Sequence, residues 1–339
     1  MVKIGIKGRK IIIILTAIAA MVAIGLAALF GAYGIIYSEA RKKYMPEPLE
    51  NAANTAVDKI HFLDTGSSDA ILLESDGKFA LVDAGEDTDN PRGFADLNLP
   101  GYEDKVVEYL KRVATGADGK VTLEFVVGTH AHSDHLGGFD TVISDPDIVV
   151  KEAYLKEYDA TRISTDEVED WDNTEVYEHM LAACDARGVR VISDLASREI
   201  RLGNFNITIY NGAVADYGER VGENDNSLAL LITDGRYKAL LMGDVNFNHG
   251  VEKAIGRAVG KVDLIKVGHH GNLWSTGTPF LSATKPDIAI FTNVEGGAKF
   301  PVEFRLAMTC GTAMYATGEY GGIVAAMEAD GIKLYSGIH

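Results

Sequence analysis

Cysteine is scarce in this sequence: Cys184 and Cys310 are the only two among 339 residues. Two cysteines allow at most one disulfide, so a small secreted scaffold held together by several disulfides is excluded. Their wide separation also differs from the closely paired cysteines of structural zinc sites. A metal site in this chain would therefore use other ligands, and the two thiols either form one disulfide or stay free.

Basic residues are also few. The chain has 32 Lys and Arg against 49 Asp and Glu, which gives a formal net charge of −17. Proteins bind nucleic acid chiefly through Lys and Arg contacts to phosphate, with release of counterions. An acidic chain is a poor match for that polyanion, so nucleic acid is disfavoured as a partner. A neutral or cationic substrate suits this charge better, unless bound metal ions supply local positive charge.

Charged residues are absent from residues 11–37, a run of 27 residues. About 20 apolar residues span a bilayer, whereas a cleavable signal peptide has an apolar core of about 7–15. The length therefore predicts an uncleaved anchor, with residues 1–43 forming a basic cytoplasmic stub and a single-pass transmembrane helix. Secretion after cleavage near Ala40 is the alternative. Four basic residues precede the run and three follow it, which favours a cytoplasmic N-terminus and an extracytoplasmic catalytic part by a small margin.

The rest of the chain has the pattern of one mixed domain. Residues 44–58 contain two prolines and are predicted to form a linker, and no similar break interrupts residues 59–339. Apolar periodicity predicts strands at 60–64, 70–74, 79–83, 123–129, 206–210, 228–233, 237–242, 262–267 and 287–292, and helices at 104–114, 174–186 and 251–259. Residues 315–339 are expected to supply the last strands. Strands in both halves, with helices between them, predict an α+β fold of two sheets packed face to face and covered by helices.

Three of the nine histidines fall within six consecutive residues. His130, His132 and His135, together with Asp134, follow the apolar run 123–128 and precede a Gly-Gly turn. A strand that ends in such a loop lets alternate side chains converge above the edge of the sheet. Three imidazoles and a carboxylate at this spacing can hold two metal ions side by side.

Two later strand ends complete the predicted site. Asp244 follows the apolar run 240–242, and His269 and His270 follow the strand at 262–267. One ion would be held by His130, His132 and Asp244, and the other by Asp134, His135, Asp244 and one of His269 or His270. Nitrogen and oxygen ligands suit two divalent ions, zinc first, with manganese or iron as alternatives. Such a pair lowers the pKa of a bridging water towards neutrality and stabilises developing charge.

The pattern HxHxDH over residues 130–135 resembles that of the metallo-β-lactamase fold. The resemblance implies a four-layer αββα hydrolase with a dinuclear metal centre. β-Lactamases add a ligand histidine between this cluster and the later positions, but here that stretch contains only His179, inside a predicted helix. This departure argues against β-lactamase activity. It also implies an open position on the first metal ion, which suits a phosphate oxygen.

Two branches of that fold are similar beyond the metal motif. One is the metallo-hydrolase domain of competence DNA-uptake channels, which is similar around residues 61–66, 83–85 and 266–271, although the multi-span channel of that family has no counterpart in this sequence. The other is the catalytic module of teichoic-acid phosphorylcholine esterases, which residues 59–292 resemble more closely. Motifs shared with the esterases include Asp83-Ala84-Gly85-Glu86-Asp87, Tyr154-Leu155-Lys156-Glu157-Tyr158, Trp171-Asp172-Asn173, Asn226-Ser227-Leu228 and Gly260-Lys261-Val262-Asp263-Leu264.

The esterase resemblance implies a role for each predicted ligand. It matches one ion to His130 and His132, the other to Asp134, His135 and His270, and the bridge to Asp244. His269 then lies beside the ligands or contacts substrate, and Asp134 and His269 are the candidate catalytic residues. In that family a hydroxide held between the metal ions attacks the phosphorus of a phosphodiester and releases phosphorylcholine. The expected protein is a membrane-anchored, outward-facing phosphodiesterase acting on a small-molecule or cell-envelope substrate.

Substrate contacts are predicted at Tyr158, Arg162, Trp171, Asn226 and Trp274. Trp171, Trp274 and Tyr158 could form a cation–π cage for a quaternary ammonium, or they could be core aromatics. The aromatic choline-binding repeats that tether those esterases are absent, so the membrane anchor would replace them. Alternative functions are a competence-type extracellular nuclease, a lactonase or thioesterase on the same site, and a non-enzymatic module. No protein partner is evident from the sequence.

Overall fold

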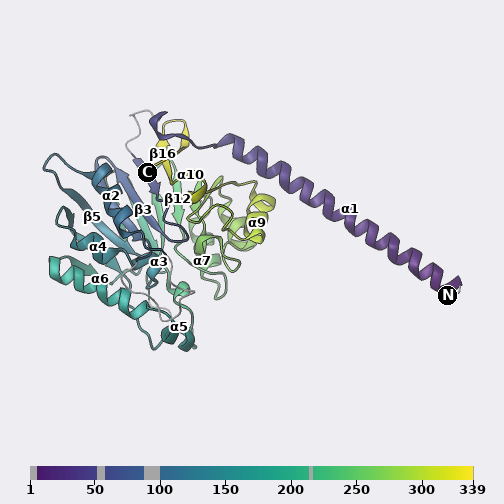
Figure 1. Cartoon of the computed structure of the whole chain (residues 1–339), viewed down its shortest axis with the longest axis horizontal. Coiled ribbons are helices and arrows are strands. Elements are labelled where there is room, and N and C mark those ends of the chain that lie inside the picture. The colour runs from purple at the N-terminus through teal and green to yellow at the C-terminus, as the bar shows by residue number, and fades with distance from the viewer. Residues whose placement is uncertain (1–5, 52–57, 88–99, 214–216, 339) are drawn as a thin grey trace.

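The computed structural model describes residues 6–51, 58–87, 100–213 and 217–338 (Figure 1). In these residues two sheets pack face to face, and helices cover both outer faces. The first sheet contains β1 (Glu47–Pro48), β2 (Asp58–Phe62), β3 (Ala70–Ser75), β4 (Lys78–Ala84), β5 (Val121–Gly128), β6 (Ile148–Val150), β7 (Glu152–Leu155), β8 (Arg190–Ile192), β16 (Ile323–Glu328) and β17 (Gly331–Ser336). Its order is β1-β17-β16-β2-β3-β4-β5-β7-β8, and β6 also pairs with β5.

The second sheet has the order β15-β14-β13-β12-β11-β10-β9. Its strands are β9 (Glu199–Leu202), β10 (Phe205–Tyr210), β11 (Ala229–Thr233), β12 (Lys238–Leu241), β13 (Leu264–Lys266), β14 (Ile288–Phe291) and β15 (Ala313–Ala316). The described helices are α1 (Ile6–Lys43), α2 (Glu103–Ala114), α3 (Ser133–Leu136), α4 (Phe139–Ser144), α5 (Thr165–Asp170), α6 (Asn173–Arg187), α7 (Val251–Val259), α8 (Thr278–Thr284), α9 (Phe300–Cys310) and α10 (Thr317–Tyr320). Short 3-10 turns lie at Leu49–Asn51, Glu223–Asn226 and Gly268–Gly271.

Alternating side chains on the strands build three apolar layers. On β3, Ile71 and Leu73 point into the core between the two sheets, whereas Leu72 points to the outer core beneath α2, α4 and α6. This alternation follows from the two-residue period of a strand. A third core lies between the second sheet and α7, α8 and α9. The predicted four-layer αββα arrangement is confirmed, and every strand and helix expected from periodicity is present within a few residues.

Parallel pairing sets the place of the functional site. Strands β12, β13, β14 and β15 pair in parallel, as do β4, β5, β7 and β8 in the other sheet. The carboxyl ends of parallel strands lie at one edge of a sheet, where loops can bring functional side chains together. Asp244 follows β12 and His270 follows β13, and the loop that begins at Thr129 follows β5. The sequence-distant motifs therefore meet at one end of the two sheets.

The C-terminal strands close the first sheet against its N-terminal strand. β16 pairs antiparallel with β2, with Ala325 opposite Ile60, and β17 follows as a hairpin. Within the predicted linker at 44–58, β1 pairs in parallel with β17, with Glu47 opposite Tyr335. The beginning of that segment therefore adds to the edge of the sheet.

Glycine at position 256 allows two helices to approach closely. A Cβ atom on Gly256 of α7 would lie 2.8 Å from Cδ2 of Phe280 on α8. The apolar stripe of α7 that includes Ile255 and Val259 packs in the third core. The low helix propensity of glycine is therefore offset by tertiary packing at this position.

The first helix is continuous from the apolar run to the domain. Residues 15–43 have the length and hydropathy of a membrane-spanning helix, and Figure 1 shows the N-terminal part of α1 projecting away from the sheets. Its last turns contact the domain through Arg41, whose guanidinium lies 5.2 Å from the Tyr315 ring and pairs with Glu319 at 2.6 Å. The backbone oxygen of Arg41 also accepts a hydrogen bond from the Tyr315 hydroxyl. The helix is thus fastened to β15 and α10.

A buried carboxyl in the first turn of α7 makes stability depend on pH. Burial raises the pKa of Glu252 to about 7, although its carboxylate accepts hydrogen bonds from the amides of Thr276 and Gly277. Because the folded pKa lies above the unfolded value, this group contributes most at low pH, and its contribution falls as pH rises from about 4.5 to about 7. Glu252→Gln should remove that part of the pH dependence, about 3 kcal/mol.

Urea unfolding of the wild type and of Glu252→Gln at several pH values in this window measures the difference. Lys253→Gln, the neighbouring exposed residue on α7, is the matched control and should keep the wild-type slope. Identical pH slopes for the wild type and Glu252→Gln would show that Glu252 is ionised throughout the window.

Candidate metal centre

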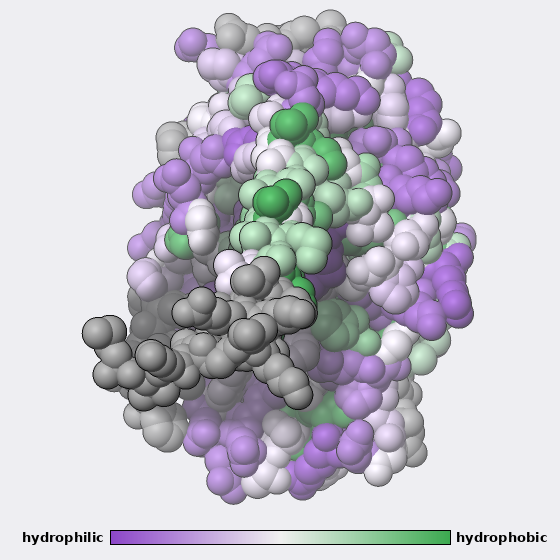
Figure 2. Space-filling view, turned by 90° about the vertical axis from the view of Figure 1, so that its right-hand side faces the viewer, coloured by the Kyte–Doolittle hydropathy of each residue, from purple (hydrophilic) through white to green (hydrophobic). Residues whose placement is uncertain are grey.

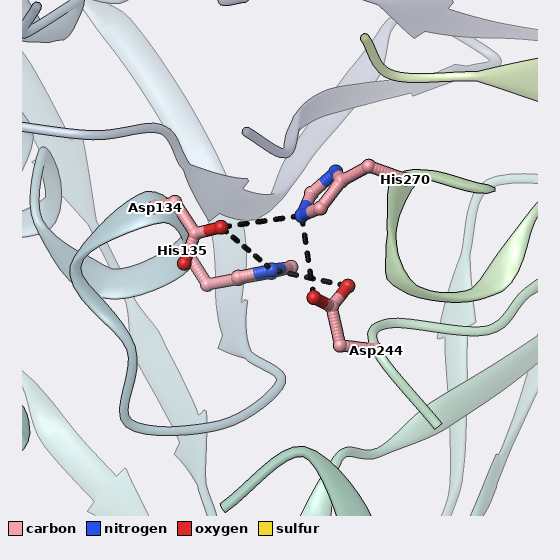
Figure 3. Close-up of side chains that lie close together, drawn as sticks. All are labelled: Asp134, His135, Asp244 and His270. Atoms are coloured by element: carbon pink, nitrogen blue, oxygen red, sulfur yellow. Dashed lines mark ion pairs between the residues drawn. The ribbon is translucent and has the colours of Figure 1, made fainter. Parts of the chain in front are cut away.

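The side chains of Asp134, His135, Asp244 and His270 come together at one end of the two sheets. His270 Nε2 lies 3.2 Å from an oxygen of Asp134 and 3.3 Å from an oxygen of Asp244. His135 Nε2 lies 3.2 Å from the other oxygen of Asp244 and 3.9 Å from Asp134. Figure 3 shows the four side chains pointing toward one another, with Asp134 and His135 on one segment and Asp244 and His270 on two others. Their ligand atoms all lie within 4.8 Å of one another, so the group can hold a metal ion.

The chemistry of this group fits a cation. The Nε2 atoms of His135 and His270 are buried and have no hydrogen-bond partner among the described residues. Burial opposes charge on both rings, but the nearby carboxylates, Asp244 foremost, raise the pKa of each well above its ordinary value. Without a metal ion, protons on these rings supply the positive charge that the carboxylates require. A divalent ion would displace those protons, as metal binding to histidine generally does.

His130 and His132 present a second pair of nitrogens. His130 Nε2 lies 3.0 Å from His132 Nδ1, and the His130 and His135 ring centroids are 4.2 Å apart. Burial lowers the pKa of His130 well below its ordinary value, so its ring is neutral, as a metal ligand must be. These two nitrogens therefore lie close together, and the His130 ring adjoins the first group through His135. This is the position that the sequence predicts for one of two ions.

Each predicted ligand ring is held from behind by an oxygen. The partner of His135 Nδ1 is Asp83 at 2.8 Å, and that of His132 Nε2 is Glu167 at 2.7 Å. The partners of His270 Nδ1 are the backbone and hydroxyl oxygens of Thr292, each at 3.1 Å. His130 Nδ1 lies 3.1 Å from the Thr129 hydroxyl. Such oxygens fix the orientation of a ligand ring and raise its basicity.

Asp83 also fixes the loop that carries the histidines. Its carboxylate accepts hydrogen bonds from the amide and the hydroxyl of Thr129, both at 2.8 Å. Asp83 has a φ of 54°, a region that non-glycine residues seldom adopt outside constrained sites. The sequence places Asp83 at a strand end but assigns it no role. Its role depends on contact with Thr129 and His135, which are distant along the chain in the loop after β5.

Lys266 is a buried cation beneath the site. Its ammonium lies 2.6 Å from Asp69, 3.3 Å from Asp244 and 2.9 Å from the backbone oxygen of Gly243. Lys266 is fully buried. The three contacts match the three donors of the ammonium group. Lys266 and Asp69 were not identified as site residues from the sequence, although a lysine within an apolar strand just before Gly-His-His-Gly was a usable signal.

The paired histidines after β13 occupy different positions. His270 is buried in the cluster, whereas the side chain of His269 is 22% exposed, with Nε2 at 3.7 Å from Asp244. Nδ1 of His269 lies 3.1 Å from the Asn246 side-chain oxygen. Both residues have positive φ values, 49° and 50°. The geometry favours His270 as the ligand and leaves His269 beside the site, as the sequence resemblance implies.

The predicted substrate contacts are dispersed. The Trp171 ring lies 4.7 Å from that of His132, and the Asn226 amide donates to Glu223 at 2.9 Å. Trp274 is 55% exposed and lies 6.0 Å from the Phe247 ring. Tyr158 packs on Tyr177 of α6 at the edge of a core, and Arg162 bonds Asp159 at 3.2 Å. Among the predicted substrate contacts, Trp171 adjoins the ring of a predicted metal ligand. His179, the histidine between the two ligand motifs, lies exposed on α6.

The contact between Glu167 and His132 gives a testable expectation. Glu167→Gln keeps a hydrogen-bond acceptor but removes the charge that makes His132 Nδ1 a stronger ligand. Loss of such an outer partner lowers metal affinity by about 10–100-fold, and we expect about tenfold here. Competition with a chelator during metal titration measures the change. Glu169→Gln on the same helix has an exposed side chain and should leave the affinity unchanged; equal losses in both variants would contradict the assignment.

Comparisons with known proteins agree with the fold. A family model described as the metallo-beta-lactamase superfamily matches residues 63–169. "Recombination protein 2" of Haemophilus influenzae is 26% identical over 235 residues, which cover 69% of this chain and 24% of that protein. "ComE operon protein 3" of Bacillus subtilis is 25% identical over 177 residues, covering 52% of this chain and 20% of that protein. The chain thus spans about a quarter or less of the length of these relatives, which fit the competence branch of the resemblance.

Solved structures are similar at lower identity. The metallo-beta-lactamase fold protein YhfI of Bacillus subtilis is 13% identical; the match covers 83% of this chain and all of that one, with a TM-score of 0.46. The Zn(2+)-bound PqqB of Methylobacterium extorquens is 11% identical, covering 73% of this chain and 85% of that one, with a TM-score of 0.42.

Proposed function

We propose that this chain, whose residues 63–169 match the metallo-beta-lactamase superfamily, is a membrane-anchored, metal-dependent phosphodiesterase. The observation that carries the proposal is the asymmetry of the two ligand groups. Asp134, His135, Asp244 and His270 form a full set for one ion, whereas His130 and His132 face the neighbouring position with fewer ligands. A position with fewer protein ligands can accept an oxygen of the substrate. A phosphodiester offers two such oxygens on the reacting atom.

The metal ions and the residues around them would have separate roles in the reaction. When bound, two divalent ions would lower the pKa of water and stabilise charge on phosphorus oxygens; zinc is the proposed metal. Asp134 and Asp244 hold the site's negative charge from opposite sides. His269 can accept a proton at Nε2, because burial lowers the pKa of the ring and Nδ1 of the neutral ring donates its hydrogen to Asn246. This places a neutral base 3.7 Å from Asp244.

Carboxylates near His132 favour a substrate with positive charge. Glu223 accepts a hydrogen bond from the amide of Ala131, and Glu167 pairs with His132. Asp225 is buried beside His249 at 3.5 Å. A polyanion would be repelled here, whereas a phosphodiester with a cationic head group would be attracted. Trp171 adds an aromatic ring of the kind that binds quaternary ammonium. A choline-bearing cell-envelope phosphodiester is therefore the proposed substrate.

Two phosphodiesters, together with a lactone and a thioester, distinguish the candidate activities of the full chain loaded with zinc. We expect hydrolysis of p-nitrophenyl-phosphorylcholine to exceed that of bis-p-nitrophenyl phosphate, and both to stop on chelation. Faster cleavage of bis-p-nitrophenyl phosphate would support the phosphodiesterase assignment but contradict the proposed specificity for choline. Absence of hydrolysis of any phosphodiester, with activity on a lactone or thioester, would overturn the proposal.

A nuclease is the second candidate, favoured by the two competence-type relatives. It uses the same site and the same attack on phosphorus. The net charge of −17 predicts weak binding of DNA at physiological salt. Degradation of single-stranded DNA in preference to the choline ester, at physiological salt, would support this candidate over the esterase.

The orientation of the anchor is also proposed. The N-terminus would lie in the cytoplasm and the domain outside, since four basic residues precede the apolar run and three follow it. Protease added to intact cells would then degrade the domain and leave the N-terminal stub. Protection of the domain until the cells are opened would reverse the orientation.

A further inference from the structure

The free length of α1 sets where a bilayer would meet the domain. The described side chains of residues 15–31 are exposed, and partial burial against the domain begins at Ala32. The charge-free run begins at Ile11, so 21 residues lie between its start and Gly31. At 1.5 Å per residue this length is about 32 Å, close to the roughly 30 Å of a bilayer's hydrocarbon core. The first contacts of α1 with the domain therefore fall at the membrane–water interface.

Aromatic side chains of α9 make those first contacts. Phe300 lies 5.9 Å from Phe30 and 5.4 Å from Tyr33, measured between ring centroids, and Phe304 lies 5.7 Å from Tyr33. Phe300 remains 43% exposed. Figure 1 shows α9 on the side of the domain that faces α1. Aromatic rings are enriched at the level of the lipid head groups, where this packing places them.

The loop that carries His270 packs on α9. Arg305 donates hydrogen bonds to the backbone oxygens of Leu273 at 3.2 Å and Ser275 at 2.8 Å. The amide of Lys299 donates to Gly271 at 3.0 Å. Continuous contact therefore runs from α1 through α9 to the loop after the metal-site histidine.

This loop exposes two large apolar side chains. Leu273 is 40% and Trp274 is 55% exposed, three and four residues after His270. We call Leu273, Trp274 and Phe300 the interfacial rim. Figure 2 faces the side from which α1 projects, and it shows hydrophobic surface along the helix with smaller hydrophobic patches near it on a largely hydrophilic face. Exposed aromatic and aliphatic side chains beside a membrane helix are suited to the boundary between head groups and acyl chains.

We infer that the interfacial rim rests on the bilayer that α1 crosses, so that the site beside it receives a phosphodiester anchored in that bilayer. This inference rests on the proposed function for its substrate, and on the geometry of α1 and α9 for its membrane contact. The contact is apolar rather than electrostatic, because the acidic domain would be repelled by anionic lipids. The substrate class is a head-group phosphodiester of a zwitterionic lipid or of a lipid-linked polymer.

Tryptophan fluorescence tests the membrane contact without any reaction. The full chain is reconstituted in vesicles of phosphatidylcholine brominated near the carbonyl end of its acyl chains. Trp171 and Trp274 are the only tryptophans. We expect bromine to quench the emission, and the Trp274→Phe variant to lose that quenching because Trp171 lies beside His132. Emission from Trp274 that is unchanged by brominated lipid would overturn the inference, whatever the activity.

A second comparison tests the substrate class. Leu273→Ser should lower hydrolysis of a phosphatidylcholine-type diester in vesicles by about tenfold, because burying a leucine contributes at least the free energy of a tenfold change. Hydrolysis of water-soluble bis-p-nitrophenyl phosphate should not change. Val149→Ser, similarly exposed at 43% against 40% for Leu273 but on β6 of the other sheet, is the control and should change neither rate.

The outcomes separate the inference from the proposed function. Equal loss on both substrates, or no loss on the bilayer substrate, would contradict the role of the rim. If neither diester is hydrolysed while brominated lipid still quenches Trp274, the membrane contact stands and the phosphodiesterase assignment fails.

Discussion

Asp244→Asn is expected to lower phosphodiesterase activity by about 10³-fold or more, since a metal ion supplies several kcal/mol to the transition state. Asp244 lies 3.2 Å from His135 Nε2 and 3.3 Å from His270 Nε2, so its two oxygens reach both rings of the cluster. The asparagine keeps the shape but loses the charge and one anionic oxygen. Bound metal should therefore fall together with activity, as measured by elemental analysis and by steady-state rates.

Asp287→Asn is the matched control for this substitution. Asp287 lies before β14, at the opposite edge of the same parallel strands, and its side chain is 44% exposed beside Lys261. It should retain wild-type activity and metal content. If Asp244→Asn loses activity but binds the same amount of metal, Asp244 does not bridge the ions and acts in another way.

Lys266→Met is expected to destabilise the fold by about 3–5 kcal/mol, the usual cost of removing one partner from a buried ion pair. The substitution leaves Asp69 and Asp244 without the cation that lies 2.6 Å and 3.3 Å from them. Methionine has a similar length, so little of the effect comes from lost volume. Chemical denaturation of the metal-free and metal-loaded full chain measures the free energy of unfolding in each state.

Asp69→Asn provides the control for charge. The double variant Lys266→Met with Asp69→Asn should recover part of the lost stability, because no unpaired carboxylate remains at position 69. Burial opposes ionisation of Asp69, but Lys266 and the histidine rings lower its pKa to about 2. The pair's contribution is therefore complete above the unfolded pKa, near 4, and is lost as pH falls through about 2. Additive losses in the double variant would show that packing, not charge, explains the effect.

The fold could be predicted well where the pattern is local. The neighbouring strands at 70–74 and 79–83 and the helix at 104–114 follow from apolar spacing, and they are present as β3, β4 and α2. The pairing of β16 with β2 could not be predicted from the sequence. These strands are more than 250 residues apart, and no local sequence pattern shows which distant strands pair. Short elements such as β6 and α5 are also below the length at which periodicity is informative.

The ligand motif itself could be predicted, whereas the residues behind it could not. The spacing in 130–135 and the glycine-flanked histidines identify side chains that the structure brings together. Glu167 has no motif, since it lies on a short helix and reaches His132 only through the path of the chain. Lys266, unlike Glu167, could be recognised from the sequence. A charged residue inside an apolar strand requires a partner, and this rule marks Lys266 before its partner is known.

The metal content of the full chain tests the account most directly. Purified protein loaded with zinc and freed of excess metal should contain two ions per chain by elemental analysis. His130→Ala should reduce that number to one, because the group containing Asp134, His135, Asp244 and His270 remains. Two ions in the wild type and one in the variant are the predicted result. Less than one ion per wild-type chain would contradict the dinuclear centre and the phosphodiesterase built on it.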